Sequence, residues 1–208
     1  MNKPSMQFER ELRAMGHQII AGVDEVGRGP LAGPVCAAAA ILPPDFDHGI
    51  LHDSKKLSES KRESIYAELT NDAQVIWHCV MVEPEEIDRI NILQATWVAM
   101  RRAVLGLAQK ADAALIDGKQ VKNFPIPHKA IIKGDSLSFS IAAASVIAKV
   151  TRDRLMHDLA VKHPEYGFEQ HKGYGTPQHL AALRLHGPCP IHRRSFEPVA
   201  QQTLRLDP

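Results

Sequence analysis

The stretch HQIIAGVDEVGRGPLAGPVCAAAAIL, residues 17–42, decides the fold because it predicts two strands joined by a glycine-rich turn. Residues 17–26 alternate between polar and apolar side chains and include isoleucine and valine, as strands do. Residues 35–42 form a second apolar run of strand length, and the segment between the two runs is rich in glycine and proline. The stretch therefore predicts a β-hairpin.

The remaining sequence predicts three further strands and four helices around this hairpin. The strands are expected at residues 74–82, 113–117 and 129–133. The helices are expected from Ser58 or Ser60 to Leu69, from Pro84 to about Leu107, from Ser138 to His163, and from Gln178 to His186. The second helix has an apolar stripe, expected to be core, at Ile90, Leu93, Trp97, Met100, Val104 and Leu107. This order predicts an α/β fold with one mixed five-stranded sheet, flanking helices and a helical C-terminal region at about 164–208.

Length and composition favour a single domain. The 208 residues, 44% of them hydrophobic, are enough to bury a substantial core. We expect one domain at residues 18–208, preceded by a polar N-terminal extension at residues 1–17. No signal peptide or long apolar run occurs, so a cytoplasmic protein without membrane contact is expected. The three widely spaced cysteines are expected to be free thiols.

The formal net charge of +1 hides a local excess of positive charge. Residues 119–154 contain seven lysine and arginine side chains and two aspartates, which gives a local excess of 7 − 2 = +5. Such an excess is compatible with a solvated face or with a partner that carries phosphate, and composition leaves both interpretations open.

Four acidic residues are predicted at or near strand ends. Asp24 and Glu25 end the first strand, whereas Asp117 and Asp135 each follow an apolar run and adjoin a glycine. Each aspartate alone could form a turn or cap a helix. Together, four carboxylates repel one another until a cation neutralises them, and their oxygens suit Mg²⁺ or Mn²⁺ better than zinc. One difficulty is that adjacent side chains of a regular strand, such as Asp24 and Glu25, point to opposite faces.

Two other motifs are weaker. Residues 27–32 fit the pattern of a dinucleotide-binding loop, but an apolar strand follows where that fold requires a helix. His186, Cys189 and His192 are potential zinc ligands, but they lack a clear fourth ligand. Ordinary loop packing is the expectation for these three side chains.

Six motifs, taken in order, resemble bacterial ribonuclease HII, the type 2 ribonuclease H. They are Gly22–Pro30, Asp53–Ser58, Leu115–Gly118, Lys133–Ser136, Ala143–Asp153 and His171–Gly175, and the match spans about residues 18–197. The resemblance implies an RNase H-like catalytic domain at residues 18–208. It also implies metal-dependent endonucleolytic cleavage of RNA in RNA/DNA hybrids and at single ribonucleotides in duplex DNA. The alternative is an inactive module that only binds hybrids, and the retention of all four acids argues against it.

The resemblance also implies roles for particular residues. The catalytic and metal-binding residues would be Asp24, Glu25, Asp117 and Asp135, with two Mg²⁺ or Mn²⁺ ions. The nucleic-acid-binding residues would be Gly27, Arg28 and Gly29 at the 2′-hydroxyl, Tyr174 at the junction with DNA, and Lys149 and Arg152 at phosphates. Cutting is expected on the 5′ side of a ribonucleotide, leaving 3′-hydroxyl and 5′-phosphate ends, by a protein that acts as a monomer.

Overall fold

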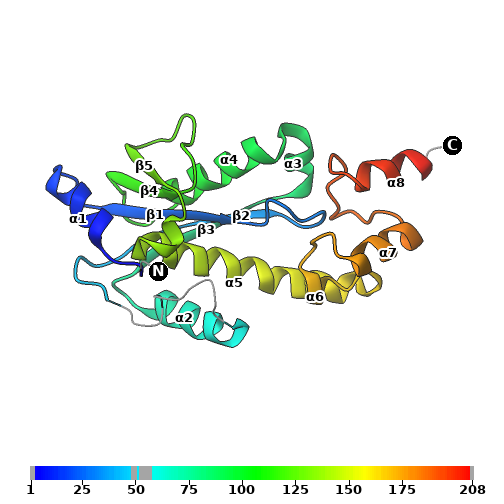
Figure 1. Cartoon of the computed structure of the whole chain (residues 1–208), viewed down its shortest axis with the longest axis horizontal. Coiled ribbons are helices and arrows are strands. Elements are labelled where there is room, and N and C mark those ends of the chain that lie inside the picture. Colours follow the sequence, from blue (N-terminus) through cyan, green and yellow to red (C-terminus); the bar gives the residue numbers. More distant parts are fainter. Residues whose placement is uncertain (1–2, 48–50, 52–57, 207–208) are drawn as a thin grey trace.

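The computed structural model describes residues 3–47, 51 and 58–206, and the predicted hairpin lies in the middle of one five-stranded sheet (Figure 1). The strand order is β3-β2-β1-β4-β5. The β1–β2 and β2–β3 pairs are antiparallel, whereas β1–β4 and β4–β5 are parallel. The strands are β1 (Ile20–Val26), β2 (Val35–Ile41), β3 (Ile76–Val82), β4 (Ala113–Asp117) and β5 (His128–Ile131). The predicted mixed sheet is therefore confirmed, and residues 53–57 of the Asp53–Ser58 motif lie outside the described residues.

Helices cover both faces of the sheet (Figure 1). One face carries α3 (Pro84–Ile90) and α4 (Ile92–Leu105), and the other carries α5 (Phe139–Lys162), with α2 (Glu59–Asn71) packed against it. Beyond the β1–β2 end of the sheet lie the helices of the C-terminal region, α6 (Phe168–His171), α7 (Pro177–His186) and α8 (Val199–Leu206). No helix among the described residues is both long and apolar enough to span a membrane.

Small side chains at the centre of the sheet let the helices approach closely. Strand β2 is buried along its whole length and contains four consecutive alanines, at positions 37–40. On β1, a Cβ atom added to Gly22 would lie only 2.0 Å from the carbonyl carbon of Ser140. Helix α5 thus meets β1 at backbone distance, which only glycine permits.

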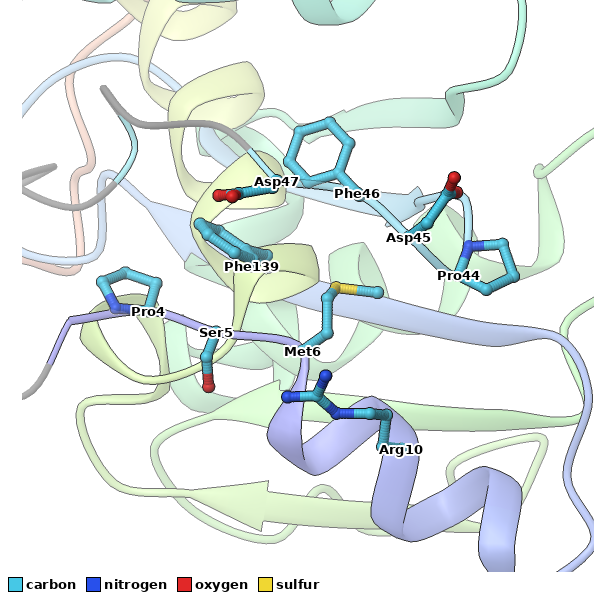
Figure 2. A pocket seen from close by; sticks show the side chains of 9 residues that line it. All are labelled: Pro4, Ser5, Met6, Arg10, Pro44, Asp45, Phe46, Asp47 and Phe139. Carbon is cyan, nitrogen blue, oxygen red and sulfur yellow. The ribbon is translucent and has the colours of Figure 1, made fainter.

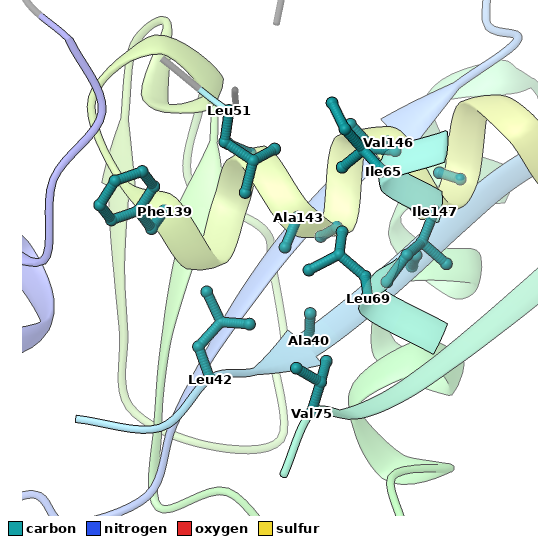
Figure 3. Close-up of a cluster of buried hydrophobic side chains, with 14 of the residues drawn as sticks. Ala40, Leu42, Leu51, Ile65, Leu69, Val75, Phe139, Ala143, Val146 and Ile147 are labelled. Carbon is teal, nitrogen blue, oxygen red and sulfur yellow. The ribbon is translucent and has the colours of Figure 1, made fainter. Parts of the chain in front are cut away.

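One core cluster lies between α2, α5 and β2 (Figure 3). Ile65 and Leu69 of α2 face Ala143 and Ile147 of α5, and Ala40 of β2 lies beneath them. These side chains are almost fully buried. Burial of apolar surface stabilises the fold by about 25 cal/mol per Å², so this layer fixes α5 on the sheet.

The helix predicted from Pro84 to about Leu107 is in fact two helices. Asn91 separates them with a φ of 66°, and its side chain accepts a hydrogen bond from the Gln94 amide at 3.1 Å. Leu93, in the first turn of the second helix, is 42% exposed, so its assignment to the core was wrong, whereas Met100, Val104 and Leu107 of the predicted stripe are buried. The buried residues of α4 are Ala95, Thr96, Ala99, Met100, Ala103 and Val104.

Serine side chains cap two helices at the predicted starts. The Ser58 side chain accepts a hydrogen bond from the Lys61 amide, so Ser58 rather than Ser60 caps α2. Ser138 caps α5 in the same way, and α5 ends before His163 as predicted. Helix α8 lies in the C-terminal region that was expected to be helical, but no separate helix was predicted at its position.

The polar N-terminal stretch contains a helix, α1 (Gln7–Ala14), that packs on the sheet domain. Its Glu9 is only 1% exposed and accepts hydrogen bonds from the Ser138 hydroxyl at 2.6 Å and the Ser140 amide at 3.1 Å. A carboxylate at this point satisfies one free amide of the first turn of α5 and interacts favourably with the helix dipole. Residues before the first strand therefore help to position α5.

Replacing Gly22 with alanine should destabilise the fold severely, because the new Cβ would collide with the backbone of Ser140 and Ile141. We expect a loss of about 3 kcal/mol or more in the free energy of unfolding, measured by urea denaturation. Gly16→Ala is the matched control, since its Cβ would meet nothing within 4 Å and only its φ of 103° is unfavourable, at a cost of about 1 kcal/mol. Equal losses in the two variants would contradict close packing as the cause.

Candidate active site

Two of the predicted acids, Asp24 and Asp117, lie at matching positions near the ends of neighbouring strands. Strands β1 and β4 run parallel, and Val23 pairs with Ile116. Asp24 and Asp117 each follow that pair by one residue, so both side chains lie on the face of the sheet covered by α5. Asp24 is only 6% exposed, which places its carboxylate in a largely desolvated position.

Glu25 joins this pair electrostatically. Burial raises the pKa of Asp24 well above its usual value, and the charges of Glu25 and Asp117 raise it further, while the Ser145 hydroxyl lowers it. Burial also raises the pKa of Glu25; the Arg28 guanidinium, 3.3 Å from Oε1, lowers it, and the Asp117 charge raises it. Although adjacent strand residues point to opposite faces, both acids of β1 therefore interact with the carboxylate on β4.

Asp117 also fixes the turn that carries the fourth acid. Its Oδ1 accepts a hydrogen bond from the Gly134 amide at 2.6 Å and a longer one from the Asp135 amide at 3.4 Å. The Asp135 side chain is half-buried and accepts from the Ser136 hydroxyl at 3.3 Å. The structure thus brings Asp135 next to Asp117 through its backbone.

The chemistry of these groups suits a hard divalent cation. Carboxylates that raise one another's pKa in a desolvated setting are stabilised by a cation, and their oxygen atoms match Mg²⁺ or Mn²⁺. Across the described residues, no three or more His, Cys, Asp or Glu side chains already form a group that could hold a metal ion.

Arg152 is buried inside the protein rather than facing a substrate. Its side chain is fully buried, and its guanidinium donates to the carbonyls of Pro34 at 2.9 Å, Lys172 at 3.0 Å and Ala32 at 3.2 Å. The predicted phosphate contact is therefore wrong, because the donor groups are occupied by backbone carbonyls. Burial lowers the pKa of Arg152 below its usual value.

Arg193 has a similar position, although none of the six sequence motifs contains it. It is fully buried, and its guanidinium donates to the carbonyls of Gly33 at 2.9 Å, Arg28 at 3.0 Å and Gly27 at 2.5 Å. Burial, together with the charge of Arg152, lowers its pKa to about 9. Only the basic character of residues 192–194 could have drawn attention to it.

The glycine loop at residues 27–34 lies against the turn that carries Tyr174. The Leu31 amide donates to the Gly173 carbonyl at 2.8 Å, and a Cβ at Gly29 would lie 3.6 Å from the Tyr174 ring. Tyr174 is 43% exposed, so its ring is available to a partner beside this loop. Lys149 is partly exposed and forms an ion pair with Asp153 at 2.6 Å.

The suspected zinc ligands form a packed aromatic cluster instead. His192 Nδ1 lies 3.1 Å from Cys189 Sγ, and His192 Nε2 lies 3.0 Å from His179 Nε2. His186 instead packs edge-on against Tyr166. His179 Nδ1 also hydrogen-bonds the Tyr174 carbonyl at 3.0 Å, so the cluster supports the tyrosine turn.

A surface pocket beside α1 is separate from these residues (Figure 2). It lies between the N-terminal segment, the loop after β2 and the start of α5. Its lining consists of Pro4, Ser5, Met6, Arg10, Pro44, Asp45, Phe46, Asp47 and Phe139. None of the predicted site residues contributes to it.

Comparison with known proteins decides the family. The sequence pattern described as Ribonuclease HII matches residues 21–199 of the chain. The chain belongs to the ribonuclease HII family. A ribonuclease HII from Xanthomonas axonopodis pv. citri is 58% identical over 184 residues, which cover 88% of this chain and 75% of the relative. One from Shouchella clausii is 52% identical over 206 residues, which cover 99% of this chain and 79% of the relative.

Solved structures agree with this assignment. The ribonuclease H2 from Pyrococcus horikoshii superposes with a TM-score of 0.77 at 28% identity, covering 90% of this chain and 98% of that one. A Bst ribonuclease HIII solved in complex with Mn²⁺ shares the fold, with a TM-score of 0.65 at 18% identity over 91% of this chain and 70% of that one. The predicted fold and family are confirmed, and the chain is an endoribonuclease that cleaves RNA in RNA/DNA hybrids and at embedded ribonucleotides.

The histidine cluster predicts sensitivity of this ribonuclease HII to acid. Burial, together with the charge of His179, lowers the pKa of His192 to about 3, so the folded state keeps this imidazole neutral. The unfolded chain binds a proton there below about pH 6.5. Stability should therefore be complete above about pH 6.5 and fall by up to about 1.4 kcal/mol per pH unit as the pH drops toward about 3.

Urea denaturation between about pH 7 and pH 5, which spans the unfolded-state pKa, measures this effect. We expect His192→Gln to flatten the dependence of the unfolding free energy on pH, while the exposed His186→Gln leaves it as in the wild type. An equally steep dependence in the His192 variant would show that other groups cause the loss.

Proposed function

We propose that Asp24, Glu25, Asp117 and Asp135 form the catalytic, cation-binding site of this endoribonuclease. The rise in the pKa values of Asp24 and Glu25, caused by burial and by the neighbouring carboxylates, is the observation that carries this assignment. The position of Asp24 and Asp117 on adjacent parallel strands also supports it, since functional groups gather at the carboxyl ends of such strands.

The divalent cations are proposed to be Mg²⁺ or Mn²⁺, two of them during catalysis. Held by the four carboxylates, the cations would supply activation of the attacking water and stabilisation of the leaving oxygen. The protein's own groups hold the carboxylates in place: the Ser145 hydroxyl orients Asp24, and the Gly134 amide orients Asp117. The Mn²⁺ complex of the Bst ribonuclease HIII lends general support to a divalent ion.

We further propose that the loop Gly27–Gly29 reads the 2′-hydroxyl of the ribonucleotide. The loop lies two residues after Glu25, and the ring of Tyr174 lies beside Gly29, which supports a joint role in recognising the ribonucleotide and the DNA next to it. Cleavage on the 5′ side of the ribonucleotide, with 3′-hydroxyl and 5′-phosphate products, is part of this proposal. Lys149 remains a proposed phosphate contact, supported by its partial exposure and its place in the basic segment.

The domain limits and cellular setting are proposals as well. We propose one catalytic domain at residues 18–208, with residues 1–17 as an extension whose helix α1 packs on that domain. The enzyme is proposed to act as a monomer in the cytoplasm, on RNA/DNA hybrids and on duplex DNA that contains ribonucleotides.

The acid assignment is tested by removing one charge at a time. Asp24→Asn, Glu25→Gln and Asp117→Asn should each slow cleavage of a labelled hybrid on the order of 100-fold or more. Hybrid binding should stay equal or tighten, because a negative charge near phosphate is lost. Asp135→Asn should have a similar but milder effect.

The matched control is Asp158→Asn, an exposed aspartate on α5. Full activity of the folded Asp24 and Asp117 variants, or an equal loss in the Asp158 variant, would contradict the assignment.

The loop assignment is tested with three substrates: a duplex with one ribonucleotide, its all-DNA counterpart, and a long hybrid. Only the two substrates that contain ribose should be cut, and Tyr174→Ala should reduce cutting at the single ribonucleotide by about tenfold or more through loss of stacking. Tyr174→Phe keeps the ring and should retain most of the activity. A sequencing gel that shows cutting of the all-DNA duplex would refute the proposal.

A further inference from the structure

The loop at residues 27–34 turns most of its carbonyl groups into the protein. Six of its eight carbonyls accept hydrogen bonds from two buried arginines. The Arg193 guanidinium donates hydrogen bonds to the carbonyls of residues 27, 28 and 33, and the Arg193 amide donates to the carbonyl of residue 31 at 2.8 Å. The Arg152 guanidinium donates to the carbonyls of residues 32 and 34. The conformation of the loop is therefore set from beneath by these two residues.

Peptide geometry then fixes the direction in which the amide groups of the loop point. In a trans peptide, the carbonyl of one residue and the N–H of the next point in opposite directions. Since the carbonyls of Gly27 and Arg28 point to Arg193, the amides of Arg28 and Gly29 point away from it. Among the described residues these two amides donate to no partner, whereas those of Leu31 and Gly33 donate to Gly173 and Ile191.

Arginine is the residue type that this arrangement requires. A guanidinium offers five N–H donors in a rigid planar fork, so one side chain can serve several carbonyls in fixed directions. Lysine has a single flexible ammonium group and cannot reproduce that pattern. Neither Arg152 nor Arg193 has a carboxylate ion-pair partner within the described part of the chain, so the carbonyls are what compensates their buried charges.

We propose that Arg193, supported by Arg152, is a positioning residue for substrate specificity: it orients the loop so that the Arg28 and Gly29 amides face the 2′-hydroxyl of the ribonucleotide. Neither arginine touches the substrate, since both are fully buried. The inference rests on the proposed role of the loop in reading the 2′-hydroxyl.

The test compares affinities for two duplexes that differ only at one 2′-position, one with a single ribonucleotide and one all-DNA. Fluorescence anisotropy with Ca²⁺ in place of the catalytic cation gives the ratio of the two Kd values. Arg193→Lys should reduce the preference for the ribonucleotide duplex about tenfold, the effect of misdirecting one or two hydrogen bonds, while affinity for the all-DNA duplex stays within about twofold. The matched control is Arg194→Lys, an exposed neighbour, which should keep the wild-type ratio.

The outcomes separate the inference from the proposed function. A wild-type protein without preference for the ribonucleotide would refute the role of the loop itself. A folded Arg193→Lys variant with the wild-type ratio would overturn the positioning role alone. A parallel loss of affinity for both duplexes would indicate a merely structural role and would also overturn it.

Amide hydrogen exchange on the wild-type enzyme provides a second measurement if Arg193→Lys fails to fold. The Arg28 and Gly29 amides should exchange rapidly in the free protein, more rapidly than those of Leu31 and Gly33. The ribonucleotide duplex should slow their exchange, and the all-DNA duplex should not. Slow exchange in the free protein, or no difference between the duplexes, would refute the proposed orientation.

Discussion

The backbone contact between α5 and β1 at Gly22 is the constraint on which the rest of the structure depends. Because no side chain separates the two elements, the helix is fixed at one height and one rotation above the sheet. The same helix then brings Ser145 to Asp24, Arg152 beneath the glycine loop, and Met156 against Gly33. One close contact thus links the carboxylates to the loop that follows them in sequence.

The C-terminal region supports the glycine loop at residues 27–34 rather than merely extending the domain. Arg193 lies after α7, yet its side chain reaches the loop that follows β1, and the Gly173 carbonyl receives the amide of Leu31. The dependence is mutual, because a buried guanidinium needs acceptors and a glycine-rich loop without regular pairing needs donors. The segment that contains Tyr174 is held by hydrogen bonds from Arg152 to the Lys172 carbonyl and between His179 and the Tyr174 carbonyl.

Local patterns were enough to predict much of this arrangement. Alternating apolar residues identified the hairpin, and the helix expected from Ser138 to His163 agrees with both ends of α5. The position of Asp24 and Asp117 at corresponding levels follows from strand ends that can be recognised in the sequence.

What could not be predicted involves partners far apart in the chain or a single backbone angle. The acceptors of Arg152 at Ala32 and Pro34 lie about 120 residues away from it, and those of Arg193 lie farther still. In the sequence alone, a basic residue near a proposed phosphate-binding site predicts a phosphate contact. Only the structure shows that backbone carbonyls already accept the hydrogen bonds of its side chain. Asn91 likewise breaks a continuous apolar stripe through one positive φ that the periodicity does not reveal.

Glu9 gives the polar N-terminal residues a structural role at the start of α5. Its carboxylate closes the first turn of α5, which begins three residues after the turn that carries Asp135. A shortened chain that begins at the first strand would lose this carboxylate and leave the Ser140 amide without its acceptor. Helix α1, ahead of the strand that bears Asp24 and Glu25, thus contributes directly to the start of the helix that follows Asp135.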